Sequence, residues 1–388
     1  MKNWILLLKR EFSLLKTNSV VIAIFIGAPL LYGVLLGAVY KKGKATNLPV
    51  LVIDLDQTPL SNQLLDMIDD NEVLDAVLLT NQNDLKAQII SKEYAAIITI
   101  PERFEAQLIQ KRHPEIGIDI NTSNVLTANY GVKAIQQILG TLNAGIEIEG
   151  LKKTGIPAVT AQSQYEAFGV SYNRFFNPSG NYMSFLWPGV LGIILQQVFL
   201  LALALSFARE FEEKTFYTTF MPKAKNVWNA MFVKALPFWI IGTVIIFLLR
   251  LMFPMFEVPF NANIWAILVL MIAYVLAITF LGILASIAIP SQLKATEVLM
   301  VVATPSFIIS GFTWPLSQMP PYIVALADSV PSTHFLIGLR KILMYEATLS
   351  DVWPEVKGLL ILSAIFVLLS YALLKFKIYR NKKLAVIG

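Results

Sequence analysis

Residues 175–208 are FFNPSGNYMSFLWPGVLGIILQQVFLLALALSFA, a stretch without a single charged side chain. Residues 17–40, 258–293 and 298–327 are equally free of charge. A helix needs about 20 predominantly apolar residues to cross the hydrocarbon core of a bilayer, and each of these stretches is longer than that. The sequence therefore predicts a polytopic α-helical membrane protein.

The composition supports a membrane protein and excludes several kinds of site. Hydrophobic residues make up 56% of the 388 residues and charged residues only 15%, whereas a soluble domain carries about 25% charge. There is no cysteine, so disulfides and thiolate chemistry are excluded. His113 and His334 are the only histidines and lie far apart, so no metal site is expected. The net charge of +5 comes from basic residues at the ends of apolar segments, which favours a lipid bilayer over nucleic acid as the partner.

The chain is expected to cross the membrane six times, with re-entrant helices in addition. Residues 1–17 are predicted to form an interfacial amphipathic helix, because Trp4, Leu8, Phe12 and Leu15 recur at helical spacing. Residues 18–40 hold the first span and residues 181–388 the other five. The predicted spans are 19–39, 185–207, 235–256, 264–289, 298–312 and 358–375.

Lysine and arginine indicate the orientation. They concentrate before the first span, in the 209–234 loop and in the tail after residue 375, and are sparse in the other short loops. Because cytoplasmic loops carry the excess of positive charge, both termini are expected in the cytoplasm. Arg250 lies near the outer end of the third span, and we expect its side chain to snorkel to the interface.

Residues 41–180 are predicted to form an extracytoplasmic α/β domain inserted between spans 1 and 2. Its apolar runs alternate in length and period as strands and helices do. A helix is expected to begin after Thr58, which suits an N-cap, with Pro59 in its first turn. The predicted strands are 48–53, 72–80, 95–100 and 116–120, and the predicted helices extend to residue 69 and over 83–91 and 125–151.

The chain carries no nucleotide-binding or catalytic motif. Val50–Asp54 resembles the strand that holds magnesium in nucleotide hydrolases, but the stretch from Gly37 to Gly43-Lys44 has the wrong spacing for a phosphate loop. Val50–Asp54 is therefore interpreted as a core strand, and the acidic pair Asp69-Asp70 as a solvated helix end. We expect no catalytic residue and no cofactor or metal bound by this chain.

Two polar or broken segments interrupt the apolar pattern. The 209–234 loop mixes charges with Phe211, Phe216, Tyr217 and Phe220, a combination that can bury aromatic rings in a partner's groove while acids set the register. Its candidate coupling residues are Arg209, Glu210, Glu212, Glu213, Lys214, Thr215 and Pro222. In residues 311–340, clustered proline and glycine break the helix, and broken backbone is tolerated at membrane depth only where protein or a cavity surrounds it. The candidate gate residues of this outer re-entrant segment are Gly311, Phe312, Pro315, Pro320, Pro331 and His334, of which His334 is expected to serve in capping or packing.

These motifs together resemble the type-2 ABC transporter permeases. Arg209–Thr215 has the pattern Arg-Glu-x-Glu-x-x-Thr, with Lys214 where the family has glycine. Residues 310–320, SGFTWPLSQMP, resemble the family's segment after the fifth span. Tyr172, Asn177-Pro178 and Pro188-Gly189 resemble its entry into the second span.

The resemblance implies a half-transporter in the inner membrane of a bacterial cell. It would pair with a second permease chain, identical or paralogous, and sit on ABC ATPase subunits that bind ATP and magnesium. The 209–215 loop and the N-terminal helix would transmit motion, and the 311–340 segment would act as the outer gate. The large outer domain resembles that of drug exporters, which implies export of an amphipathic drug- or lipid-like substrate, with a periplasmic adaptor (membrane fusion protein) as a further partner. No substrate-binding residue is identified.

Three alternatives compete with this interpretation. An ATPase-coupled mechanotransmitter would drive a periplasmic partner without moving a substrate, but would have fewer spans and no outer re-entrant segment. A membrane-anchored receptor with a ligand-binding outer domain leaves the 209–215 motif unexplained. An intramembrane enzyme needs paired acids or a serine with a base inside the spans, and the sequence has neither.

Overall fold

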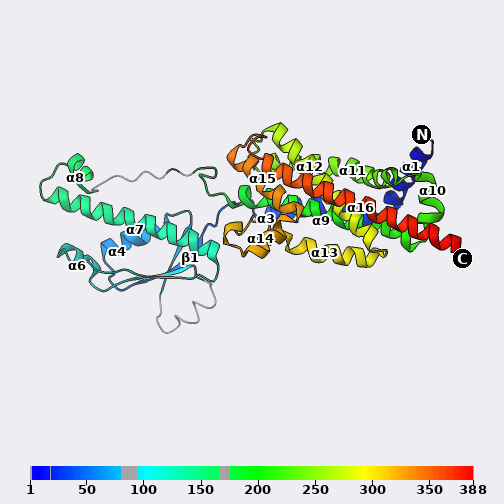
Figure 1. Cartoon of the computed structure of the whole chain (residues 1–388). Coiled ribbons are helices and arrows are strands. Elements are labelled where there is room, and N and C mark those ends of the chain that lie inside the picture. Colours follow the sequence, from blue (N-terminus) through cyan, green and yellow to red (C-terminus); the bar gives the residue numbers. More distant parts are fainter. Residues whose placement is uncertain (1, 18, 80–93, 166–172, 174, 388) are drawn as a thin grey trace. The chain divides into compact units, whose positions relative to one another are not determined.

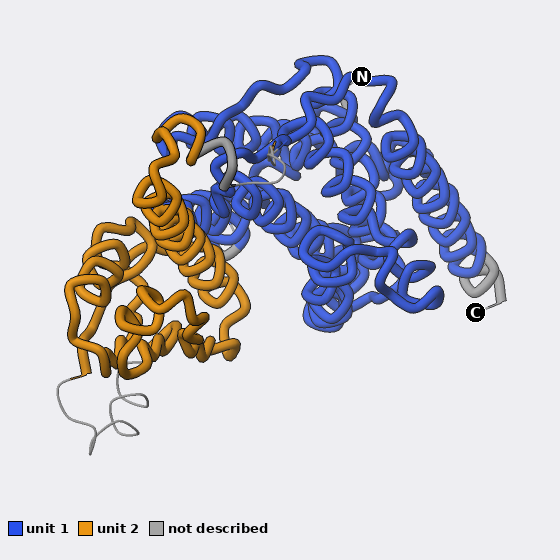
Figure 2. The backbone as a smooth tube through the Cα atoms, turned by 90° about the vertical axis from the view of Figure 1, so that its left-hand side faces the viewer, with its two compact units in different colours: residues 1–43, 174–388 blue, residues 44–173 orange. Residues whose placement is uncertain are grey.

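The computed structural model describes residues 2–17, 19–79, 94–165, 173 and 175–387. It divides into two compact units, one of residues 1–43 with 174–388 and the other of residues 44–173 (Figure 2). The first unit is helical and the second contains a sheet (Figure 1). The predicted helix over 83–91 and Tyr172 lie outside the described residues.

The helical unit confirms a polytopic membrane protein. Among the described residues, five helices are long and apolar enough to cross a membrane: α9, α11, α12, α13 and α16. The pair α14 and α15, bent by 87°, would make a sixth if counted as one span, and the first apolar segment contributes the shorter helix Ala23–Val39. The count of six spans therefore stays a prediction. The elements are α1 (Lys2–Thr17), α2 (Ser19–Ile22), η1 (Ala23–Gly27), α3 (Ala28–Val39), α9 (Tyr182–Glu212), η3 (Phe216–Phe220), α10 (Met221–Ala224), α11 (Val227–Met255), α12 (Ile264–Ala288), α13 (Gln292–Ile309), η4 (Leu316–Gln318), α14 (Pro321–Asp328), α15 (Pro331–Tyr345) and α16 (Trp353–Ile387).

Helix α9 is the centre of this unit. It packs against α3, α12, α13 and α15 (Figure 1). Glycines allow the close approach: a Cβ on Gly242 of α11 would overlap the ring of Phe199 on α9, and one on Gly192 would lie 2.5 Å from the ring of Phe335. The hydroxyl of the buried Tyr274 donates to the carbonyl of Gly192 at 2.9 Å and so satisfies a polar group inside the bundle.

The second unit holds a four-stranded sheet. Its strands are β1 (Leu48–Asp54), β2 (Leu74–Leu78), β3 (Ala96–Ile100) and β4 (Gly117–Ile120), in the order β2-β1-β3-β4. Strand β1 pairs in parallel with β2 and β3, and β4 is antiparallel to β3. Helices α4 (Pro59–Asp69), α6 (Phe104–Ile109) and α7 (Val125–Lys153) share one apolar core with the sheet, and α8 (Ala158–Tyr165) follows α7.

Local chemistry explains the start of α4. The Thr58 side chain accepts from the amide of Ser61, and the Ser61 side chain accepts from the amide of Thr58, so the predicted cap is confirmed. Asp54 ends β1 and accepts hydrogen bonds from the amides of Asp56 and Gln57 and from the hydroxyl of Ser61. Val50, Leu51 and Val52 are fully buried, so β1 is the core strand that was expected, and Asp54 caps the turn after it.

The substitution Gly242→Ala tests the packing of α11 on α9. The added methyl group has no room beside the buried Phe199 ring, so we expect a loss of about 1–3 kcal/mol and a lower unfolding temperature of the detergent-purified protein. Gly27→Ala is the control, because a Cβ there meets no atom within 4 Å. Equal unfolding temperatures for the two variants would contradict the close approach.

Candidate functional site

The predicted coupling segment is a short connection between two long helices. Helix α9 continues to Glu212, so Arg209 and Glu210 belong to its last turn, and α11 already begins at Val227. The π-helical turn η3 and the single turn α10 fill the space between them. The connection is thus shorter than the expected 209–234 loop, and its charged residues are anchored on α9.

Lys214 makes the sharp turn after α9. Its φ of 58° lies in the left-handed region, where a side chain is strained and glycine is favoured. The turn needs a positive φ, and this chain makes it with lysine at the position where the resemblance implies glycine.

Glu210 is the centre of a buried charge network. Its side chain is only 1% exposed. It accepts from Lys234 Nζ on α11 at 2.8 Å and from the Arg10 guanidinium on α1 at 2.7 and 3.2 Å. The hydroxyl of Thr215 donates to it at 2.5 Å. One carboxylate therefore joins α1, α9, α11 and the turn.

Glu11 completes the network. Its two carboxylate oxygens accept from Lys234 Nζ at 3.0 and 2.9 Å, and Arg10 lies 3.3 Å from one of them. Two acids and two bases thus balance at a site where Glu210 and Lys234 are buried and Arg10 remains partly exposed. Burial lowers the pKa of Arg10, but the hydrogen bond and charge of Glu210 outweigh it, so that pKa is raised and Arg10 stays a cation. We name the four residues Arg10, Glu11, Glu210 and Lys234 the charge network.

Aromatic rings enclose the charge network. Phe207, Phe216 and Phe220 are fully buried, and Lys234 Nζ lies 4.6 Å from the centre of the Phe220 ring. The hydroxyl of the half-buried Tyr217 donates to the carbonyl of Lys377 on α16 at 3.3 Å. The expectation that these aromatic residues insert into a partner's groove is therefore wrong for Phe216 and Phe220, which pack inside this chain.

The surface left for a partner is polar. Glu212, Glu213, Lys214, Pro222 and Lys223 are exposed along the connection. Glu213 pairs with Arg209 at 2.8 Å across one helical turn. Glu212 accepts from the side chain and the backbone amide of Gln292 at 2.9 and 3.2 Å, which ties the connection to the start of α13.

The predicted gate residues gather elsewhere in the helical unit. Gly311 has a φ of 78°, and Phe312 packs on Gly189 of α9 and stacks with Phe185 at 5.3 Å. The Arg340 guanidinium of α15 lies 4.4 Å from the centre of the Phe312 ring and donates to the Phe312 carbonyl. A pocket of about 420 Å³ lies beside them, with Pro315 and Leu316 in its wall. The turn around Gly311 is thus fixed against α9 and α15.

Prolines set the start of the two short helices that follow. Pro320 precedes α14, and Pro331 is the first residue of α15. Proline has no amide hydrogen, which is no loss at a helix N-terminus because the first amides of a helix have no partner within it. His334 Nε2 lies 3.0 Å from the carbonyl oxygen of Asp328, and its ring packs on Gly358 of α16. These contacts agree with the capping and packing role expected of His334.

The two predicted groups lie at opposite ends of α9. Gly189 touches Phe312 near one end and Glu210 joins the charge network near the other, about 30 Å apart along the helix at 1.5 Å per residue. Arg10 and Glu11 were missed as site residues. The available signal was Glu11 itself, an acid on the helix face that also carries the buried Leu7.

Comparison with known proteins identifies the family. The family model described as "ABC-2 family transporter protein" matches residues 19–372. The chain belongs to the ABC-2 transporter family. This permease is 23% identical over 380 residues to the "Probable multidrug ABC transporter permease YbhR" of Escherichia coli (strain K12), covering 97% of this chain and 98% of YbhR. It is 22% identical over 348 residues to the "Inner membrane transport permease YhhJ" of the same organism, covering 88% of each chain. It is 24% identical over 384 residues to the "Linearmycin resistance permease protein LnrN" of Bacillus subtilis (strain 168), covering 88% of this chain and 91% of LnrN.

The substitution Glu210→Gln tests the charge network. It leaves Arg10 and Lys234 with one carboxylate between them, and breaking a buried ion pair from one side costs about 3–5 kcal/mol. We expect a much lower unfolding temperature in detergent. Glu213→Gln is the matched control on the same turn: its pair with Arg209 is exposed, so the change is at most about 1 kcal/mol. If both variants unfold alike, Glu210 is not the centre of the network.

The substitution Lys214→Gly tests the left-handed turn. Glycine adopts the observed φ without a Cβ clash, so we expect a gain of up to about 1 kcal/mol and a higher unfolding temperature. Lys223→Gly, inside α10, is the control and should lower stability, because glycine loses more entropy there. A loss of stability in Lys214→Gly would show that the lysine side chain matters more than the backbone strain.

Proposed function

We propose that this permease exports an amphipathic, drug- or lipid-like compound out of the bacterial cell across the inner membrane, driven by a separate ABC ATPase. ATP and magnesium bind to the ATPase, and this chain contributes the passage. Two permease chains, identical or paralogous, form the transporter, and both termini of each lie in the cytoplasm. The 44–173 unit lies outside the cytoplasm, where it meets substrate or a periplasmic adaptor.

The observation that carries the proposal is the charge network behind the exposed connection. A partner that pushes on Glu212, Glu213 or Lys214 acts on a turn bound to Glu210 through Thr215. Glu210 in turn holds α1 through Arg10 and α11 through Lys234. Movement of an ATPase against this surface would therefore shift three helices together instead of bending one loop.

The other end of α9, near Gly189, would carry this movement to the outer re-entrant segment. Its Gly189 is in contact with Phe312, next to the turn at Gly311 and the bent pair of α14 and α15. We propose that tilting of α9 loosens this contact and opens the outer re-entrant segment, and that Gly311, Phe312, Pro315, Pro320, Pro331 and His334 form the gate. ATP binding can shift the gate only if the ATPase binds the two conformations of the connection with different affinity.

The relatives support the choice of substrate class. YbhR carries "multidrug" in its name and LnrN carries "linearmycin resistance". Both are similar to this permease over nearly their whole length. A drug- or lipid-like export substrate follows for this chain as part of the proposal, as does the ATPase partner that the family implies.

Charge reversal at Glu213 tests the docking surface. The proposal requires the exposed acid Glu213 to face a basic group of the ATPase. We expect Glu213→Arg to reduce co-purification of the ABC ATPase of the same transport system by at least roughly tenfold, because like charges opposite each other across an interface cost several kcal/mol. Glu149→Arg in the other unit is the matched control, since Glu149 also forms an exposed pair within one helix, with Lys152 at 2.7 Å. Retention of the ATPase by Glu213→Arg would move the docking site away from the connection.

Transport itself separates the proposal from a mechanotransmitter. The wild-type complex in inside-out vesicles should accumulate an amphipathic dye when ATP is added. A complex that hydrolyses ATP and moves no compound from a broad amphipathic panel would favour the mechanotransmitter, and a chain that binds no ATPase would favour the receptor.

A further inference from the structure

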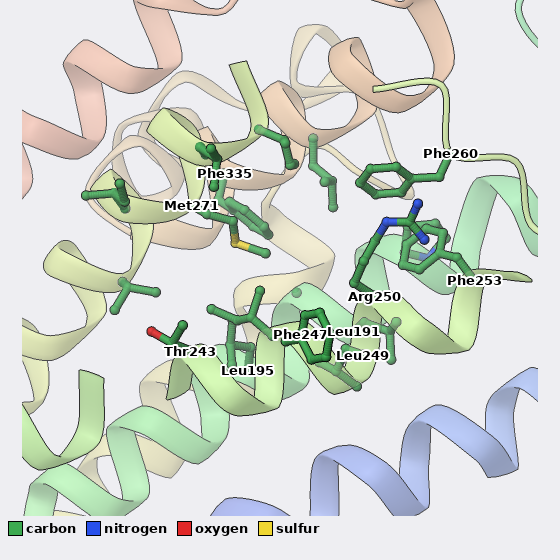
Figure 3. Close-up of a pocket in the computed structure, with 18 of the residues that line it drawn as sticks. Leu191, Leu195, Thr243, Phe247, Leu249, Arg250, Phe253, Phe260, Met271 and Phe335 are labelled. Atoms are coloured by element: carbon green, nitrogen blue, oxygen red, sulfur yellow. The ribbon is translucent and has the colours of Figure 1, made fainter. Parts of the chain in front are cut away.

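A large apolar pocket lies within the helical unit, and none of the predicted site residues lines it. Its volume is about 640 Å³, within the usual range for a ligand pocket. Residues of α9, α11, α12 and α15 form its walls (Figure 3). The walls include Leu191, Leu195, Phe247, Met271 and Phe335.

The pocket opens sideways, between α11 and α12. Phe247 of α11 is 61% exposed, and Leu268 and Ile272 of α12 are 45% and 60% exposed, and all three line the pocket. Apolar side chains on the outside of a membrane-spanning bundle face lipid tails wherever no second chain covers them. The opening is therefore a gap between two spans that an acyl chain can enter from the bilayer.

Arg250 stands at one end of this gap. Among the described residues, it is the only charged side chain in the pocket lining, and it forms no ion pair. Its guanidinium lies 3.9 Å from the centre of the Phe260 ring and 5.8 Å from that of Phe253 (Figure 3). The rings hold the cation at the pocket and leave its hydrogen-bond donors for another acceptor.

The position of Arg250 matches a lipid headgroup region. It lies about 24 Å along α11 from Lys234 of the charge network, so it is near the opposite surface of the membrane. Trp265 lies at the start of α12, just after the connection that carries Phe260, and is 68% exposed. Exposed tryptophan is typical of the membrane–water interface.

We propose that this pocket binds an anionic phospholipid, with one acyl chain between α11 and α12 and the phosphate on Arg250. Arg250 is exposed at the end of the gap, and no carboxylate of the described residues pairs with it, so a lipid of net negative charge balances its charge. The phosphate of a zwitterionic lipid is already balanced by its own ammonium group. A guanidinium forms two parallel hydrogen bonds to phosphate, which gives both affinity and orientation. The lipid fills the gap between two helices that the chain itself leaves apart.

The test measures lipid binding to the full-length purified permease by native mass spectrometry. Phosphatidylglycerol and phosphatidylcholine with identical acyl chains are titrated separately. We expect the tightest phosphatidylglycerol site to be about tenfold stronger than the phosphatidylcholine site, which is the effect of one charge-assisted contact. Arg250→Gln should reduce phosphatidylglycerol binding to the phosphatidylcholine level, and Arg250→Lys should retain most of the preference. Arg209→Gln, which removes an arginine already paired with Glu213, should change nothing.

A second variant tests the gap without touching the arginine. Leu268→Trp places a larger side chain in the pocket wall and should weaken binding of both lipids equally. The proposal is overturned if the wild type binds the two lipids alike, if Arg250→Gln keeps the preference, or if Leu268→Trp leaves phosphatidylglycerol binding unchanged. Because the measurement needs neither ATPase nor transport, its outcome is independent of the proposed export activity.

Discussion

The ion pair between Glu210 and Lys234 is the constraint on which the helical unit depends. Both side chains are almost completely buried, at 1% and 2% exposure. Neither charge could be left alone there, because an unpaired buried charge costs several kcal/mol. The pair therefore requires the end of α9 and the beginning of α11 to stay together, and the second bonds of each residue extend the requirement to α1.

The charge network fixes the relative positions of α1, α9 and α11 more than it adds to the stability of the fold. A buried ion pair gains little over a well-packed apolar pair, so stability alone does not explain it. It does fix a geometry: Glu210 accepts from three side chains, on α1, α11 and the turn. The proposed transmission of movement to several helices would need such fixed geometry, because directional hydrogen bonds define a position more narrowly than apolar contacts do.

Much of the fold followed from local patterns in the sequence. Long apolar runs predicted α9, α11 and α12, and the cap at Thr58 and the core strand ending at Asp54 were predicted from residue types alone. The family followed from motifs in their order along the chain. These features depend on period, length and turn chemistry, which neighbouring residues determine.

The charge network did not follow, because its members lie in three separate parts of the sequence. Arg10 and Glu11 precede Glu210 by about 200 residues. The position of Glu11 on the apolar face of the N-terminal helix marks it as inward-facing, but nothing local shows which residues it pairs with. The burial of Phe216 and Phe220 was missed for the same reason: an aromatic residue beside acids fits a partner's groove and the chain's own core equally well. Only the tertiary structure distinguishes the two.

Helix α11 shows how one span can carry a cation near each end. Lys234 is neutralised within the protein by Glu11 and Glu210, so its charge is independent of the surroundings. Arg250 contacts aromatic rings and pairs with no carboxylate of the described residues, so its charge is left for the surroundings to neutralise. The end of α11 at Lys234 is thereby bound to other helices of the chain, and the end at Arg250 is left to bind the molecule that occupies the gap beside α12. If the first end moves with an ATPase, the second moves against the bilayer, and a lipid held there would give the span a fixed point against which to tilt.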